Sequence, residues 1–321
     1  ADGSQPEGPR TIWRFNRAAG VHDLRMAGEA VSRTEIIESV TGVLEALPWV
    51  DAMWEGGSAA FGRVDEWSDV DLQAIAEDAR TLELFEIVEA TLKSMSPIKQ
   101  VYRVPEPAWH GHSQRFYELE KAGPFLMVDF CVMKRSSANR FLEREIHGGA
   151  RFIFDRSGVA AGVKPGDPEA WDTRLRDRLA QLTGRFRMFQ PLVTKDCLRG
   201  RPLDAAHFYQ SLTLVPLVEM LRIKHDPWRH NFGWRYLQHD LPAEDYARLV
   251  RLAYPGSVEA IPALHEEAVR WFEELAAELA ARSVLTPRRA LQGRSPPART
   301  GARAPTPGNG RLRTSSGARP S

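Results

Sequence analysis

Two short stretches near residue 60 contain the residue types that bind phosphate groups and divalent metal ions. An apolar run, 50–54, leads into Gly56-Gly57-Ser58, and the chain then reads Ser68-Asp69-Val70-Asp71-Leu72. Side chains two residues apart on a strand point to the same face, so Asp69 and Asp71 are expected to project together. Because close carboxylates repel each other unless a cation lies between them, this pair predicts a divalent metal site.

The glycine turn before the carboxylate pair has the properties of a phosphate-binding turn. Gly57 leaves room for a ligand to approach the backbone, and the exposed N–H groups and the hydroxyl of Ser58 can donate to phosphate oxygens. A phosphate-binding turn next to a metal-binding carboxylate pair is the equipment of phosphoryl or nucleotidyl transfer.

The pattern GGSxxxGxxxxxSDVDL resembles the nucleotidyltransferase superfamily of DNA polymerase β type. More narrowly, residues 36–135 resemble the bacterial aminoglycoside and lincosamide nucleotidyltransferases. That family has a third carboxylate on a neighbouring apolar strand, and PFLMVDFCVM places Asp129 in such a strand. The resemblance implies that Asp69, Asp71 and Asp129 hold two Mg²⁺ ions, and that Gly57 and Ser58 bind the phosphates of ATP or another nucleoside triphosphate.

Several polar residues are candidates for the remaining tasks of such an enzyme. Asp129 interrupts an apolar run, where an unpaired charge costs several kcal/mol, so a functional partner is expected. The general base is Asp129 itself or, as in some relatives, a separate Glu, for which Glu118 and Glu120 qualify. Arg63 follows the turn and is either a phosphate contact or an ordinary exposed arginine.

Two further segments concentrate histidine, cationic and aromatic residues. WHGHSQRFYELE contains His110, His112 and Gln114, and lining of the acceptor cleft is favoured over a zinc site because no third ligand is near. The segment 221–242 mixes arginine, histidine and Lys224 with aromatic residues. It either packs two domains together or contributes a cation, Lys224 or Arg222, to the triphosphate, with its aromatic rings stacking on base or acceptor.

Composition limits the classes of partner. No apolar run approaches the ~20 residues of a membrane span, and the two cysteines, Cys131 and Cys197, are expected to be free thiols in a reducing cytoplasm. Residues 287–321 hold eight Arg and no Asp, Glu or Lys, although the formal net charge of the chain is only +1. The rest of the chain is therefore acidic, which makes nucleic acid an unlikely partner and favours a cationic small molecule.

The apolar pattern predicts an α+β fold in which a mixed sheet with helices is followed by an all-helical part. The predicted domains are an irregular start (1–20), a polymerase-β-like catalytic domain (21–157), a helical domain (168–284) and a disordered basic tail (285–321). The expected helices are 36–47, 78–95, 136–147, 171–190, 203–224, 243–253 and 258–282, and the expected strands are 50–54, 70–76, 98–104, 114–119, 125–133 and 152–154.

Together with these patterns, the resemblance implies a cytoplasmic transferase that moves a nucleoside monophosphate, AMP from ATP, onto a hydroxyl. An aminoglycoside-like antibiotic is the favoured acceptor. A protein side chain or an RNA end, as in toxin–antitoxin nucleotidyltransferases, is the alternative within enzymes. A nucleotide-binding module without catalysis is the alternative outside them, and it is disfavoured because a binder needs no acceptor-side carboxylate.

Overall fold

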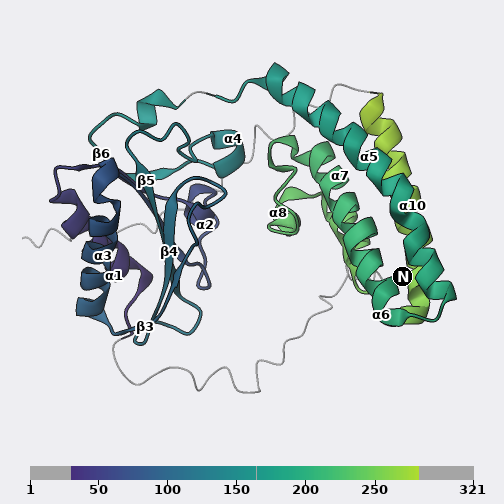
Figure 1. Ribbon diagram of the computed structural model, residues 1–321, viewed down its shortest axis with the longest axis horizontal. Helices are drawn as coiled ribbons and strands as arrows, with labels where there is room; N and C mark the ends of the chain where they lie inside the picture. Colours follow the sequence, from purple (N-terminus) through teal and green to yellow (C-terminus); the bar gives the residue numbers. More distant parts are fainter. Residues whose placement is uncertain (1–29, 164, 282–321) are drawn as a thin grey trace, which may run out of the picture. The chain divides into compact units, whose positions relative to one another are not determined.

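The computed structural model describes residues 30–163 and 165–281, which divide into a sheet-containing part and a helical part (Figure 1). Within the described residues, the first part is a six-stranded mixed sheet in the order β3-β4-β5-β2-β1-β6. Only β2 and β5 are parallel, and the other neighbours are antiparallel. The strands are β1 (Val50–Glu55), β2 (Val70–Ala76), β3 (Ile98–Arg103), β4 (Ser113–Leu119), β5 (Met127–Lys134) and β6 (Arg151–Asp155).

One face of the sheet is covered by two helices, α1 (Arg33–Glu45) and α3 (Thr81–Met95). Ser32 caps α1 by a reciprocal bond with Glu35, and the helix ends before Pro48 because proline cannot continue it. Alternate residues of β2, such as Val70, Leu72 and Ala74, pack against these helices in the main apolar core. The other residues of β2, including Asp71, therefore point to the opposite face.

The second face carries a smaller apolar core, built on Trp54, Ile75 and Met133. Chain segments around Phe141 and Phe152 pack against it rather than long helices. The two short helices of this part are α2 (Gly57–Ala60) and α4 (Arg144–His147). Near the start of β2, this face is contacted by the short helix α2, whose Gly57 lies against Asp71.

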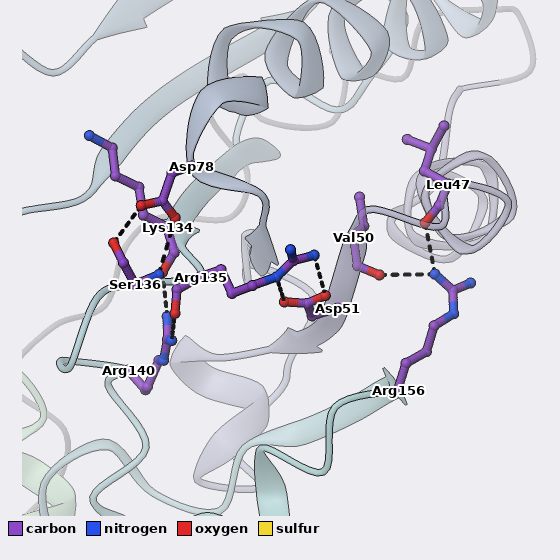
Figure 2. A network of polar contacts seen from close by, with 9 residues as sticks. All are labelled: Leu47, Val50, Asp51, Asp78, Lys134, Arg135, Ser136, Arg140 and Arg156. Atoms are coloured by element: carbon purple, nitrogen blue, oxygen red, sulfur yellow. Dashed lines mark hydrogen bonds and ion pairs between the residues drawn. The ribbon is translucent and has the colours of Figure 1, made fainter.

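The helix expected at 136–147 is wrong for most of its length, since only Arg144–His147 is helical. The guanidinium of Arg140 donates to the carbonyls of Lys134 and Arg135, which holds the loop in a non-helical path (Figure 2). Phe141 has a φ of 50°, a left-handed conformation that no α-helix contains. Local side-chain bonds to the backbone therefore replace the helix at this point.

The same end of the sheet is held by two further arginines (Figure 2). Arg135 forms a two-pronged bond to Asp51, with distances of 2.7 and 2.8 Å. Arg156 donates to the carbonyls of Leu47 and Val50, which tie β6 to the connection between α1 and β1. These bonds hold together the ends of β1, β5 and β6 that are farther from the predicted site.

The helical part begins with α5 (Pro168–Leu198), whose first turn is capped by Asp167. It is longer than the expected 171–190 because Pro191 is accommodated inside the helix. The expected helix 203–224 is interrupted by a π-helical segment, Tyr209–Leu214. The remaining helices are α6 (Pro202–Phe208), α7 (Val215–His225), α8 (Leu237–Asp240), α9 (Ala243–Ala253) and α10 (Ile261–Ala280).

The structure thus confirms a mixed sheet with helices, followed by helices alone. All described residues belong to one compact unit, so the division into domains 21–157 and 168–284 stays a prediction. The irregular start 1–20 and the tail 285–321 lie outside the described residues. Within 30–163 and 165–281, every helix is too short or too polar to cross a membrane.

Candidate active site

Asp71 and Asp129 lie on neighbouring parallel strands in the same register position. Adjacent strands are ~4.8 Å apart and both side chains point to the face opposite to α1 and α3, so the two carboxylates are neighbours. Burial raises the pKa of Asp129 to about 7, and the charges of Asp71 and Asp69 add to this effect. Burial and the charge of Asp69 also raise the pKa of Asp71. The site therefore concentrates negative charge that a proton or a cation must balance.

Gln114 of β4 is the direct protein partner of Asp129. Its side-chain N–H₂ group donates to both carboxylate oxygens, at 2.7 and 2.9 Å. These bonds favour the charged form and oppose the rise in the pKa of Asp129. The sequence predicts that Gln114 lines the acceptor cleft, which stays a prediction, and the structure shows that it binds the third carboxylate.

Asp69 lies one residue before β2, and its carboxylate is turned toward the start of β5. Its Oδ1 accepts a hydrogen bond from the backbone N–H of Met127 at 3.1 Å, and its carbonyl accepts from Nε of Arg33 at 3.1 Å. Arg33 also forms an ion pair with the buried Glu55. Arg33 is a contact that sequence patterns did not indicate, because it comes from the start of α1, 36 residues earlier in the chain.

The turn expected to bind phosphate lies directly against Asp71. Gly57 has a φ of 50°, and a Cβ added there would lie 1.9 Å from Oδ2 of Asp71. The backbone N–H of Ser58 donates to the same carboxylate and opposes the rise in the pKa of Asp71 that burial causes. The hydroxyl of Ser58 is buried and has no hydrogen-bond partner. The Gly57–Ser58 turn and Asp71 therefore form one unit, with a buried hydroxyl left to bind a ligand.

The oxygen atoms of Asp69, Asp71, Asp129 and Ser58 are the possible ligands of a divalent cation at this site. Within the described residues, no group of three or more His, Cys, Asp or Glu side chains comes together closely enough to hold a metal ion. Asp69 is engaged with the Met127 backbone, whereas Asp71 and Asp129 repel each other across two strands. A carboxylate pair with raised pKa values, beside the unpartnered Ser58 hydroxyl, is a donor set that suits a hard cation such as Mg²⁺.

Of the other base candidates, Glu118 lies on the same strand as Gln114. Its carboxylate is bound to the ammonium of Lys99 at 2.6 Å. Glu120 follows the strand and is exposed. Asp129 is the candidate that the structure places next to Asp71.

Arg63 extends from the end of the glycine turn to Asp240, in α8 of the helical part. Asp240 is 1% exposed and accepts from Arg63 at 3.1 Å, from Arg222 at 3.1 Å and from Arg229 at 3.3 Å. One carboxylate thus joins three guanidinium groups. Asp240 was not singled out from the sequence, because its role depends on residues up to 177 positions away.

Asp226 also forms an ion pair with Arg229, yet several guanidinium nitrogens of this cluster have no hydrogen-bond partner. Nη1 of Arg63 and both Nε and Nη1 of Arg229 are buried with no hydrogen-bond partner. Both guanidinium groups lie over the ring of Phe61, which ends α2, at 5.2 and 4.8 Å from its centroid. Unpaired cationic donors therefore lie next to the predicted phosphate turn.

Lys224 of α7 has a different environment. Its ammonium forms an ion pair with Glu278 of α10 at 2.8 Å. The structure thus engages Lys224 within the helical part, and among the described residues its ion-pair partner is Glu278 rather than a group of the Asp71–Asp129 site.

His110 and His112 lie in the loop before β4. They precede Gln114, the residue that binds Asp129. Both ring nitrogens of His112 are buried without a partner, and burial lowers its pKa to about 4. His112 packs edge-to-face on Phe141, with ring centroids 4.8 Å apart. Among the described residues, no group of three or more potential metal ligands forms here, and lining of the acceptor cleft by this segment stays a prediction.

No known protein-family profile and no curated protein sequence matches the chain. Among solved structures, the chain is similar to the spectinomycin adenyltransferase AAD(9) from Enterococcus faecialis, determined with ATP and spectinomycin. The two are 12% identical, the alignment covers 77% of this chain and 99% of that one, and the TM-score is 0.31. A superposition of this quality carries no argument about activity, which must come from the site itself.

Proposed function

We propose that the chain is a Mg²⁺-dependent nucleotidyltransferase that moves AMP from ATP onto a hydroxyl of a small molecule. The observation that supports it best is the register of Asp71 with Asp129, directly beside the Gly57–Ser58 turn. The two neighbouring carboxylates resist simultaneous ionisation, and the turn beside them has a free hydroxyl. This combination suits the binding of a triphosphate together with its metal ions.

In this proposal Asp69, Asp71 and Asp129 would hold two Mg²⁺ ions. When bound, the ions neutralise charge that develops on the phosphate oxygens. Gly57 and Ser58 bind the phosphates, and Arg63 contributes a positive charge from the end of the turn. Lys224 is proposed as a second phosphate contact, which requires that it leave Glu278.

The chemical step is an in-line displacement at the α-phosphorus. The acceptor oxygen forms a bond to this phosphorus while the bond to the bridging oxygen of the β-phosphate breaks, and pyrophosphate leaves. The proton of the acceptor hydroxyl passes to the carboxylate of Asp129. Asp129 suits this task because it lies next to Asp71 and the side chain of Gln114 holds its carboxylate in place.

The larger organisation follows the same proposal. The sheet-containing part would be a polymerase-β-like catalytic domain (21–157), and the helices would form a second domain (168–284). We propose an aminoglycoside-like antibiotic as acceptor, since the chain outside its last 35 residues is acidic and attracts cations.

Incubation of the purified chain with each labelled nucleoside triphosphate, Mg²⁺ and a panel of aminoglycosides tests the proposal. The expected result is a labelled acceptor and one pyrophosphate per transfer, most rapidly with ATP. Asp71→Asn serves as the inactive control. Release of phosphate without label on any acceptor, or equal label with Asp71→Asn, would refute nucleotidyl transfer by this site.

A further inference from the structure

Two exposed aromatic side chains lie at the entry ends of the strands that carry the carboxylates. Trp67 and Phe125 are each 56% exposed, and their rings meet edge-to-face with centroids 5.4 Å apart. Trp67 precedes Asp69 by two residues, and Phe125 precedes Met127 by two. Large exposed aromatic rings are costly in water unless they serve a contact, so the pair is a candidate binding surface.

The backbone beside each ring is held by hydrogen bonds to nearby carboxylates. The N–H of Trp67 donates to Oδ1 of Asp65 at 3.0 Å, and the hydroxyl of Ser68 donates to the same oxygen at 2.9 Å. The N–H of Met127 donates to Oδ1 of Asp69 at 3.1 Å and so joins the two segments. The aromatic pair is therefore fixed relative to the carboxylate site and not merely near it in sequence.

Its location indicates which substrate it would meet. In the sheet, β1 and the Gly57–Ser58 turn flank β2 on one side, and β5 with Asp129 flanks it on the other. If the turn holds the departing pyrophosphate, an in-line acceptor must approach from the β5 side. Phe125 leads into β5, so the pair lies on the acceptor side of the site.

The charges around the pair indicate the chemistry of this acceptor. Asp65 and Glu66 are exposed directly before Trp67, and Asp69 follows it. An aromatic face bordered by carboxylates suits a ring that carries ammonium groups, because the face contacts C–H bonds and cations while the carboxylates pair with the charges. We infer that Trp67 and Phe125 form a platform that binds an amino-sugar ring of the acceptor. This inference rests on the proposed function, whose substrate side it specifies.

The test measures binding of kanamycin, an amino-sugar cation, and of an ATP analogue with a methylene bridge between the α- and β-phosphates. Calorimetry on the full chain with Mg²⁺ gives both affinities without turnover. Trp67→Ala and Phe125→Ala are each expected to weaken kanamycin binding about three- to tenfold and to leave the analogue unaffected. Trp67→Phe, which keeps an aromatic face, is expected to bind kanamycin nearly as the wild type does.

Phe189→Ala is the matched control. Phe189 is a partly exposed aromatic residue of α5, 39% accessible, and lines a small cavity with Leu182, Leu212 and Val215 of the helical part. Its replacement is expected to change neither affinity, and a neutral trisaccharide such as maltotriose is expected to bind more weakly than kanamycin.

Other results overturn the inference. Loss of analogue binding with kanamycin unaffected would assign the platform to the nucleobase, and a change in oligomeric state in the variants would assign it to a second copy of the chain. Wild-type chain that binds the analogue but not kanamycin would refute the platform and leave the nucleotide side of the proposed function standing. Platform-dependent kanamycin binding without any analogue binding would refute the proposed function instead.

Discussion

Asp71 and Asp129 occupy equivalent positions on the parallel strands β2 and β5, so their carboxylates share one face and one electrostatic field. Each is more difficult to ionise than an isolated aspartate, since burial and neighbouring negative charge raise both pKa values. A cation bound between them would therefore favour the charged state of both carboxylates. This relationship allows predictions that do not depend on the identity of the acceptor.

Replacing Asp71 by Asn is expected to abolish nucleotidyl transfer and leave the fold intact. The change removes one charge from the pair and leaves the shape of the side chain almost the same. Activity should fall by at least ~10², the effect of losing a group that acts in the transition state. Asp69→Asn should also lose turnover, although its Oδ1 can still accept from Met127. Transfer assays and circular dichroism check both variants, and near-normal turnover in either would contradict the metal assignment.

Gly57→Ala is expected to damage the site because its Cβ would lie 1.9 Å from Oδ2 of Asp71. The carboxylate of Asp71 must move away. Turnover should therefore fall by much more than the loss of folded protein alone would cause. Gly62→Ala is the matched control: its φ of 63° is equally unfavourable for alanine, but no atom lies within 4 Å of the added Cβ. Both variants therefore carry backbone strain, of the order of 1 kcal/mol. If turnover falls equally in the two, the contact with Asp71 is irrelevant.

Asp129→Asn is expected to stabilise the metal-free chain at pH 8 and to have little effect on stability at pH 3. The pKa of Asp129 is about 7 in the folded chain, against an ordinary value of 3.8. Between these two pH values, the carboxyl of Asp129 ionises more readily in the unfolded chain than in the folded one. The free energy of unfolding therefore falls as the pH rises through this range. Asparagine has no proton to lose and removes the effect.

Thermal melts of both chains in chelator, from pH 3 to pH 8, measure this difference. The gain in melting temperature should grow with pH and level off above about pH 7, where the folded aspartate is ionised. Calorimetry should still detect binding of ATP with Mg²⁺, because Asp69 and Asp71 remain. A gain that is the same at all pH values would show that the buried charge is not its cause.

The elements around the carboxylates could be predicted because their signals are local. The alternation of polar and apolar residues in 70–76 assigns Asp71 to the face opposite to the helices, as observed. The almost continuously apolar run at 125–133 predicted a strand, and β5 (Met127–Lys134) lies there, between β4 and β2. The shared register position of Asp71 and Asp129 could not be predicted in this way. It follows from the pairing of β2 with β5, which short-range patterns do not encode.

The contacts that the sequence did not reveal depend on tertiary structure. Asp240 receives three arginines from distant segments, and its own neighbours give no sign of this. The loop after β5 has the apolar spacing of a helix, but the Arg140 bonds to backbone carbonyls override it. Such competition between side-chain and helical bonds is decided by what the loop packs against, here the small core beneath Phe141.

Lys224 can act as a phosphate contact only at the expense of its ion pair with Glu278. If it binds the triphosphate, Lys224→Ala should weaken ATP binding by roughly 1.5–3 kcal/mol, the range for a charged hydrogen bond. Binding of AMP should then change little, because AMP lacks the two outer phosphates. Calorimetry with both nucleotides, together with the melting temperature, is the measurement.

Glu278→Ala is the matched variant for this test. It removes the competing carboxylate and keeps the ammonium, so a phosphate-binding Lys224 becomes more available and ATP affinity should stay equal or increase. A lysine that only packs α7 against α10 behaves differently: both variants then lose the same partly exposed ion pair, worth about 0–1 kcal/mol. Equal small decreases in melting temperature, with unchanged affinity for ATP and AMP, would therefore assign Lys224 to the helical core and exclude it from the nucleotide site.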